Sequence, residues 1–114
     1  MHIDAYTFGR ITINGEEYNK DLIVFPDRIS PGWWRNEAHV LTIRDLDEII
    51  EFAPEYLIVG TGFSGILHVP DKVKAAIGKK GIDATIDRTA NAVDQFNRDV
   101  SRGKRVAGAF HLTC

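Results

Sequence analysis

The sequence has a single cysteine, Cys114, which excludes an intrachain disulfide and a paired-cysteine metal site. No apolar run is long enough to span a bilayer. The first residues lack the charged and apolar regions of a signal peptide and the arginine-rich composition of a transit peptide. We therefore expect a cytoplasmic protein without a membrane partner.

The chain also lacks a large excess of charge of either sign. It has 14 Lys and Arg against 16 Asp and Glu, a formal net charge of −2, so a nucleic-acid partner is not expected. No P-loop, nucleophile elbow or zinc-protease motif is present, and the four histidines show no ligand spacing. We expect no metal and no cofactor. A length of 114 residues with 44% hydrophobic residues predicts one domain over residues 1–114.

The first third of the chain predicts β structure. Residues 10–13 alternate, and Asn14-Gly15 is the favoured two-residue hairpin turn, which requires positive φ at both positions. The return strand begins at Glu16 and is expected to continue through residues 22–25 until Pro26. A loop over residues 30–37 and a short strand over 38–41 should follow.

From residue 42 onward, helical stripes alternate with short apolar strands. Thr42 with Asp45 predicts a helix start and Pro54 its end; a second helix spans Pro70 to Gly81, and a third runs from an N-cap at Thr89 to before Gly103. The expected strands cover residues 56–59, 82–86 and 106–112. Strands separated by helices pair in parallel with right-handed crossovers. The predicted fold is α/β, with a mainly parallel central sheet and an added N-terminal hairpin or meander.

A glycine-rich loop follows the apolar strand at residues 56–59. Residues 60–65 form a G-x-G-x-x-G pattern, and Asp87 lies at the distance of a ribose-binding acid in dinucleotide folds. A dinucleotide loop opens directly into a helix, whereas residues 66–69 intervene here before Pro70. The pattern therefore favours a structural turn or another small-ligand pocket over a dinucleotide site.

Three segments are expected to meet at the carboxyl edge of the sheet, where open α/β folds bind ligands. A small anion or carboxylate there would be framed by Gly60, Thr61, Gly62, Thr89, His111 and Cys114. Each has a structural alternative: Thr61 as a turn residue, Thr89 as a helix N-cap, His111 as a packed side chain and Cys114 as an inert thiol. The sequence leaves these alternatives open.

Trp33-Trp34-Arg35 follows Pro31-Gly32 in a predicted loop. Two adjacent tryptophans in a loop do not easily both point inward. We expect one to join the core and the other to cover the sheet or meet a protein partner or a second copy, because Trp and Arg are frequent at interface hot spots.

The chain resembles the small Mth-type domain family, which includes the adipogenesis-associated Mth-domain protein of animals and is related to a mitochondrial complex I assembly factor. The resemblance covers essentially the whole chain and rests on Gly60-Thr61-Gly62, Thr89 with Phe96-Asn97, residues 103–107 and the ending His111-Leu112-Thr113-Cys114. It implies a three-layer β+α/β/α fold and no established reaction. It also implies that Asn97 joins Gly60, Thr61, Gly62 and Thr89 in a suspected pocket. The Trp33-Trp34 loop falls in the family's variable region.

These observations favour a non-catalytic domain that acts through protein contacts, with a small anion site at the carboxyl edge. The alternative is a small enzyme or nucleotide-binding protein that uses the Gly60-Thr61-Gly62 loop, Thr89 and residues 111–114. The mitochondrial role of the related assembly factor is not carried over, because no transit peptide is recognised.

Overall fold

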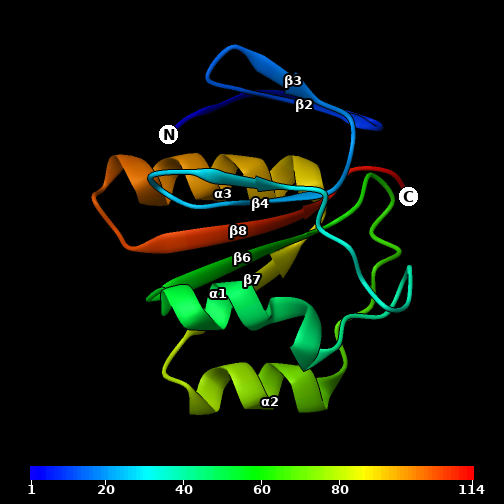
Figure 1. Ribbon diagram of the computed structural model, residues 1–114, viewed down its shortest axis with the longest axis vertical. Helices are drawn as coiled ribbons and strands as arrows, with labels where there is room; N and C mark the ends of the chain where they lie inside the picture. Colours follow the sequence, from blue (N-terminus) through cyan, green and yellow to red (C-terminus); the bar gives the residue numbers. More distant parts are fainter.

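A five-stranded mixed sheet forms the centre of the computed structural model, which describes all residues from 1 to 114 (Figure 1). Its strand order is β5-β4-β8-β6-β7, and a separate antiparallel sheet has the order β1-β2-β3. The strands of the central sheet are β4 (Leu22–Val24), β5 (Ile29–Pro31), β6 (Tyr56–Thr61), β7 (Asp83–Asp87) and β8 (Val106–His111). The strands of the small sheet are β1 (Ile3–Thr7), β2 (Arg10–Ile13) and β3 (Glu16–Tyr18).

The parallel part of the central sheet confirms the predicted order of strands and helices. Strands β8 and β7 both pair in parallel with β6, with helices on the connections. The expectation of a mainly parallel sheet is wrong, because β4 pairs antiparallel with both β5 and β8. The sheet is therefore mixed, with parallel pairing on one side of β8 and antiparallel pairing on the other.

The predicted return strand of the hairpin is divided between the two sheets. Strand β3 ends at Tyr18, and residues 22–24 instead form β4 of the central sheet. All three residues of β4 are buried, which requires cover on both faces. A strand at the edge of a hairpin would be covered on one face only. The chain therefore leaves the small sheet after β3, and residues 22–24 enter the central sheet.

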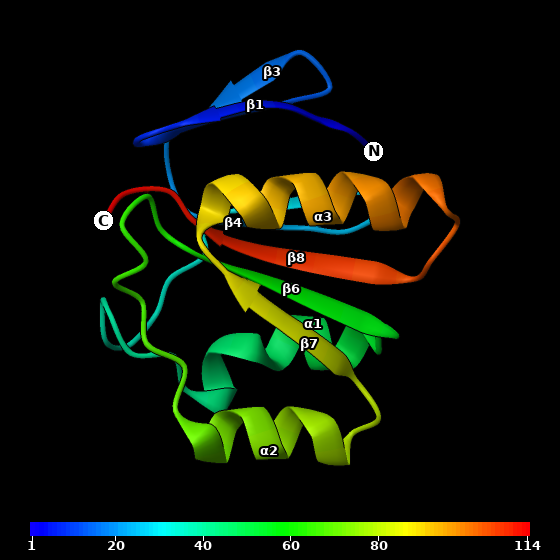
Figure 2. The ribbon, with the colours of Figure 1, turned by 180° about the vertical axis from the view of Figure 1, so that it is seen from behind.

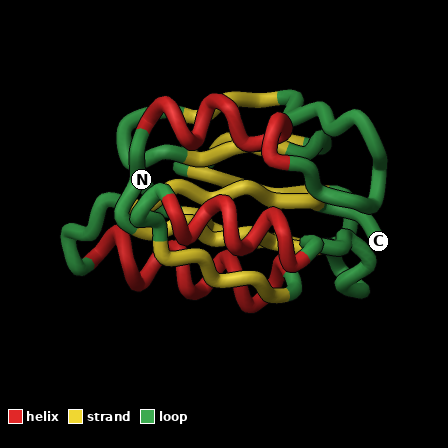
Figure 3. Tube along the Cα trace, turned by 90° about the horizontal axis from the view of Figure 1, so that it is seen from below, coloured by secondary structure: helices red, strands yellow, loops and turns green.

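Helices cover both faces of the central sheet and run lengthwise along its strands (Figures 2 and 3). Helix α3 (Thr89–Ser101) lies with the small sheet on one face, where Phe96 and Phe110 belong to a shared apolar cluster. On the other face, η1 (Ile43–Leu46), α1 (Asp47–Phe52) and α2 (Asp71–Lys79) enclose a second cluster around Leu57 and Val59. None of these helices could cross a membrane, since none is both long and apolar enough.

One loop prediction and one strand prediction are wrong. Residues 29–31 form edge strand β5, where Pro31 is tolerated because an edge strand leaves one side unpaired. The strand expected over residues 38–41 is absent, and this segment makes only isolated bridges, from Val40 to Glu37 and to His68. The predicted helix start at Thr42 is confirmed by the Thr42 N–H, which donates to Asp45 Oδ2 at 2.8 Å.

The hairpin turn at Asn14-Gly15 has the predicted positive φ at both residues, 50° and 83°. We predict that Gly15→Ala lowers the free energy of unfolding by about 1 kcal/mol, because a Cβ disfavours the left-handed conformation. No atom lies within 4 Å of the Cβ position, so the effect would be purely conformational. Thermal or urea denaturation measures it.

Gly78→Ala is a matched control for this substitution. Gly78 lies within α2, and a Cβ there also meets no atom within 4 Å. Since alanine favours a helix, this variant should be as stable as the parent or gain up to about 1 kcal/mol. Equal stability of Gly15→Ala and the parent protein would contradict the assigned turn energetics.

Candidate functional site

The carboxyl ends of β6, β7 and β8 lie together, as their parallel order predicts. The Gly62 N–H donates to Thr89 Oγ1 at 2.9 Å, and the Thr89 hydroxyl donates to the carbonyl of His111 at 2.6 Å. Three predicted site residues from three segments thus form one buried hydrogen-bond chain. The Thr61 hydroxyl makes a separate bond at the same edge, to the carbonyl of Asp87 at 3.0 Å.

Most backbone donors of the glycine loop are engaged within the chain itself. The Phe63 N–H donates to the carbonyl of Thr113 at 2.7 Å, and the N–H groups of Ser64 and Ile66 donate to the carbonyl of Cys114 at 3.2 and 3.1 Å. An anion that used these groups would have to displace residues 113–114. The loop therefore holds the end of the described chain against the sheet.

Close packing accounts for two glycines of the loop. A Cβ on Gly60 would lie 2.7 Å from Thr89 Oγ1, and a Cβ on Gly62 would lie 2.5 Å from the carbonyl carbon of Cys114. Gly62 also has a φ of 107°. Because glycine has no side chain, the Thr89 hydroxyl and the Cys114 backbone can approach the loop closely, in the space that a ligand was expected to occupy.

Two predicted residues occupy different structural positions from those expected. Thr89 is the first residue of α3 rather than its N-cap, which is Arg88, and the Thr89 hydroxyl bonds across the sheet edge instead. Asn97 lies farther along α3, where its side chain pairs with both the N–H and the carbonyl of Ile3 at 2.9 Å. Asn97 therefore joins β1 to α3 and does not lie with the other six residues.

Neither the cysteine nor the histidines form a metal site. Cys114 is a free, exposed thiol, and no group of three or more His, Cys, Asp or Glu side chains has a geometry suited to a metal ion. His111 is buried, and its ring meets that of His39 edge to face at 5.9 Å between centroids.

An ionic cluster that the sequence did not indicate lies beside His111. Asp21 Oδ2 is 2.7 Å from His111 Nδ1 and 2.9 Å from Arg35 Nη2, and Asp21 Oδ1 accepts from the Leu112 N–H at 2.8 Å. The side chains of Arg35 and His111 are each only 6% exposed. We call Asp21, Arg35 and His111 the clasp, because it fixes the segment around Arg35 to the end of β8.

Distances within the clasp select the tautomer of His111. Arg35 Nη2 lies 3.1 Å from His111 Nδ1. If Nδ1 accepted a hydrogen bond from Arg35, its lone pair would also point at Asp21 Oδ2, only 2.7 Å away, and the two acceptors would repel. Nδ1 therefore carries the proton and donates it to Asp21. Two buried atoms, Arg35 Nη1 and His111 Nε2, have no partner in the chain. Each costs roughly 1–3 kcal/mol unless a water or ligand satisfies it.

The charge of Asp21 depends on its clasp partners. Burial by itself would raise the pKa of the Asp21 carboxyl, but the hydrogen bonds from His111, the Leu112 N–H and Arg35 outweigh it. The pKa therefore lies below its ordinary value of 3.8. Asp21 is a carboxylate at neutral pH and balances the Arg35 guanidinium.

The two tryptophans divide between core and surface, as the sequence analysis expected. Trp33 is 8% exposed, its indole N–H donates to the carbonyl of Asp45 at 2.9 Å, and the guanidinium of Arg35 lies 4.6 Å from its ring centre. Trp34 points away and is 75% exposed. Inward residues 33 and 35 thus hold the segment, while Trp34 is displayed.

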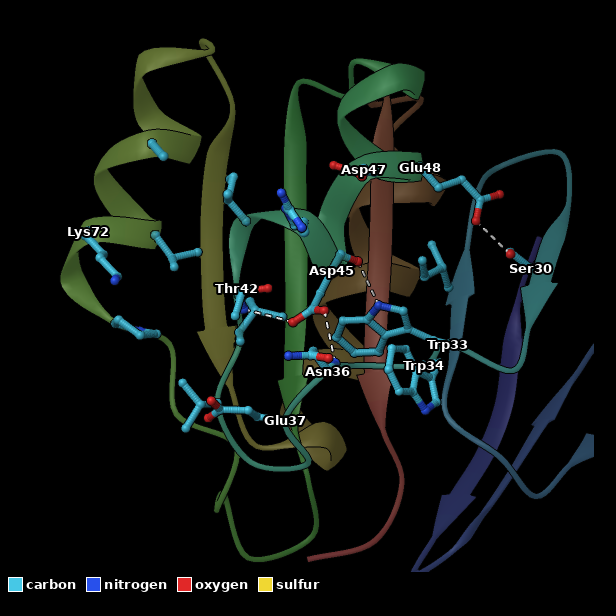
Figure 4. A pocket seen from close by; sticks show the side chains of 18 of the residues that line it. Ser30, Trp33, Trp34, Asn36, Glu37, Thr42, Asp45, Asp47, Glu48 and Lys72 are labelled. Atoms are coloured by element: carbon cyan, nitrogen blue, oxygen red, sulfur yellow. Dashed lines mark hydrogen bonds between the residues drawn. The ribbon is translucent and has the colours of Figure 1, made fainter.

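Trp34 lines a groove of about 1000 Å³ between residues 32–48 and helix α2 (Figure 4). Its apolar lining includes Leu41, Ile43 and Val73, and its polar lining includes Asn36. The clasp residues do not line it, because Trp33 separates Arg35 from this space. No sequence motif marked this groove, although the unusual Trp33-Trp34 pair indicated its location.

A second cavity, of about 500 Å³, lies beside Thr61 at the carboxyl edge. Lys74 and Arg88 line it together with residues 64–69. Of the residues predicted to bind a ligand, only Thr61 contributes to its wall.

We predict that Asp21→Asn lowers the free energy of unfolding by about 3 kcal/mol at neutral pH, because it leaves the buried Arg35 without its counter-charge. The exposed Asp27, whose ion pair with Arg28 is open to solvent, supplies the control. Asp27→Asn should change stability by less than about 1 kcal/mol. Urea denaturation of both variants measures the difference.

The effect of Asp21→Asn should also depend on pH. Folding lowers the pKa of Asp21, so its contribution is complete above the ordinary value of 3.8 and declines as the pH falls through the lower folded-state value. The stability difference between parent and variant should therefore be constant near neutrality and narrow below about pH 4. A difference that widens on acidification would contradict this account of the clasp.

Comparison with known proteins places the fold. The protein of known structure MT938 shares 30% sequence identity, with 99% of this chain and 98% of that chain covered and a TM-score of 0.82. The conserved hypothetical protein PH1505 from Pyrococcus horikoshii OT3 shares 24% identity over 100% of both chains, with a TM-score of 0.82. A Bordetella pertussis protein described as a Mth938-like domain shares 20% identity over 97% of this chain and 85% of that chain, with a TM-score of 0.75; these last two likenesses concern the fold alone. A family profile described as "Protein of unknown function (DUF498/DUF598)" matches residues 3–111. The chain therefore belongs to this family of Mth938-type domains.

Proposed function

We propose that this protein acts through protein contacts and that Trp34, with the adjacent groove, forms its binding surface. The observation that carries the proposal is the 75% exposure of a tryptophan at the mouth of a groove of about 1000 Å³. Tryptophan is among the most frequent interface hot-spot residues, and an exposed one loses unfavourable hydration on binding. In this proposal the protein is a non-catalytic binding domain that works in the cytoplasm.

The rigidity of the segment that carries Trp34 supports this role. Neighbours on both sides are fixed: Trp33 by its bond to Asp45 and Arg35 by the clasp. The backbone N–H of Trp33 also donates to the carbonyl of Asp21 at 2.7 Å. A surface held in place before binding loses less conformational entropy when a partner orders it, so a pre-organised Trp34 can contribute more of its contact energy to affinity.

We predict that Trp34→Ala weakens binding of a captured partner by about 30-fold or more, the effect of truncating an interface hot spot. The parent protein and the variant would each be immobilised and exposed to extract of the source organism, and enriched proteins would be quantified by mass spectrometry. A purified candidate partner would then be titrated calorimetrically. Proteins bound by the parent and lost from the variant are the expected result.

Phe8→Ala is the matched control. Phe8 is also an exposed aromatic residue, at 53%, but it contacts Phe63 near the glycine loop and does not line the groove. The Phe8 variant should capture the same partners as the parent. Capture that is identical for the parent and Trp34→Ala would refute the proposed surface.

A second candidate function, binding of a small anion, is supported by the cavity beside Thr61. Lys74 and Arg88 place two cationic side chains on its wall, and the Thr61 hydroxyl lies at the same edge of the sheet. Asp87 also lines the cavity, but its carboxylate accepts from the Arg88 N–H at 2.7 Å and from Asn91 at 3.3 Å. This site relies on cationic side chains and not on the glycine-loop N–H groups, because those of Gly62, Phe63 and Ser64 are already engaged.

Titration with inorganic phosphate tests this second candidate. Phosphate at about one hundred times its dissociation constant should add roughly 2.7 kcal/mol of stability, seen as a higher melting temperature. Lys74→Gln combined with Arg88→Gln should abolish the shift, whereas Lys79→Gln combined with Arg102→Gln, at helix ends away from the cavity, should retain it. An equal loss of the phosphate-induced melting-temperature shift in both double variants would refute a site in this cavity, because it would show that phosphate acts on the overall charge of the protein.

A further inference from the structure

The wall of the Trp34 groove is predominantly acidic. Four carboxylates line it, against two cations, Arg44 and Lys72. The carboxylates belong to Glu37, Asp45, Asp47 and Glu48. Lys72 comes from α2, on the opposite side of the groove from the tryptophans, whereas Asp47 and Glu48 begin α1 (Figure 4). The groove therefore has a net negative charge.

The four carboxylates are not equally available. Asp45 accepts from the N–H groups of Thr42 and Asn36, and Glu48 accepts from the Ser30 hydroxyl at 2.7 Å. These two hold the groove in shape. The carboxylates of Glu37 and Asp47 have no hydrogen bond or ion pair within the chain, and both residues are exposed. They can accept a cation from outside without breaking a contact.

An exposed indole and free carboxylates on the wall of one groove suit a basic segment that contains arginine. A guanidinium stacks on an aromatic face and can donate to a carboxylate through its edge at the same time. The same segment already shows this preference, since Arg35 lies over Trp33 and donates to Asp21. Trp34 and Glu37 place an indole and a carboxylate at separate positions on the wall of the groove (Figure 4), and neither side chain is paired with a cation of the chain.

We propose that the groove binds an arginine-bearing, basic segment of a partner protein. One guanidinium of the segment stacks on Trp34, a second cationic side chain pairs with Glu37 or Asp47, and an apolar side chain lies against Leu41, Ile43 and Val73. The inference rests on the proposed function, because it names the partner for the same surface. It adds the claim that the charge of the partner, and not its apolar content alone, determines binding.

Synthetic peptides of defined sequence test the claim. A peptide of alternating leucine and arginine would be titrated into the protein by calorimetry and compared with two matched peptides, one with citrulline and one with glutamate in place of arginine. Citrulline keeps the shape of arginine and removes its charge. The arginine peptide should bind most tightly, and its affinity should fall as salt concentration rises.

Paired variants assign the effect to the groove. Trp34→Ala should weaken the arginine peptide by about 30-fold. Glu37→Gln combined with Asp47→Asn should weaken it by about three- to tenfold, the usual range for exposed charge pairs. Asp83→Asn combined with Asp94→Asn removes two exposed carboxylates on β7 and α3 and should leave the affinity unchanged.

Several outcomes would overturn the inference. They are absence of binding, equal affinity for the arginine, citrulline and glutamate peptides, unchanged affinity in the Glu37/Asp47 variant, or an equal loss in the Asp83/Asp94 control. A natural partner that needs Trp34 but ignores the Glu37/Asp47 variant would refute the basic partner and leave the proposed function intact. Loss of Trp34 dependence in the capture experiment would instead refute the proposed function itself.

Discussion

Burial of β8 on both faces is the constraint on which the rest of the structure depends. All six of its residues are buried, and it lies between antiparallel β4 and parallel β6. The space around β8 is so closely packed that a Cβ on Gly108 would lie 2.6 Å from the ring of Phe110. A strand without a solvent face requires cover from both sides, which α3 and the small sheet supply on one face and η1, α1 and α2 on the other.

The same strand positions the clasp. Because β4 runs antiparallel to β8, the residue before β4 lies beside the residue after Phe110: Leu22 pairs with Phe110, so Asp21 meets His111 and Leu112. Arg35 completes the ion pair from a loop. One strand pairing therefore sets the sheet, fixes a buried charge and holds the segment that displays Trp34.

Local periodicity was sufficient to predict β6 to β8 and the helices between them, because each strand and each helical stripe is visible within about ten residues of sequence. The position of β4 was not predictable in this way. Residues 22–24 continue a hairpin pattern, and only their pairing with distant β8 places them elsewhere. The convergence of Gly62, Thr89 and His111 could be predicted from parallel topology. That the carbonyls of Thr113 and Cys114 accept from the loop N–H groups could not. A glycine pattern indicates close approach to the backbone without saying that Cys114 makes that approach. Asp21 and Arg35 belong to no motif, so their meeting with His111 required the fold.

The division of residues 33 to 37 between inward and outward side chains separates stability from recognition. Trp33 and Arg35 are fixed by contacts within the chain, whereas Trp34, Asn36 and Glu37 direct their side chains outward along the groove that Trp33 also lines. Outward side chains can therefore be exchanged without disturbing the contacts that hold the segment. A fold built in this way can change the surface that it presents over evolutionary time while its buried framework stays the same, and divergence of partners would not require divergence of architecture.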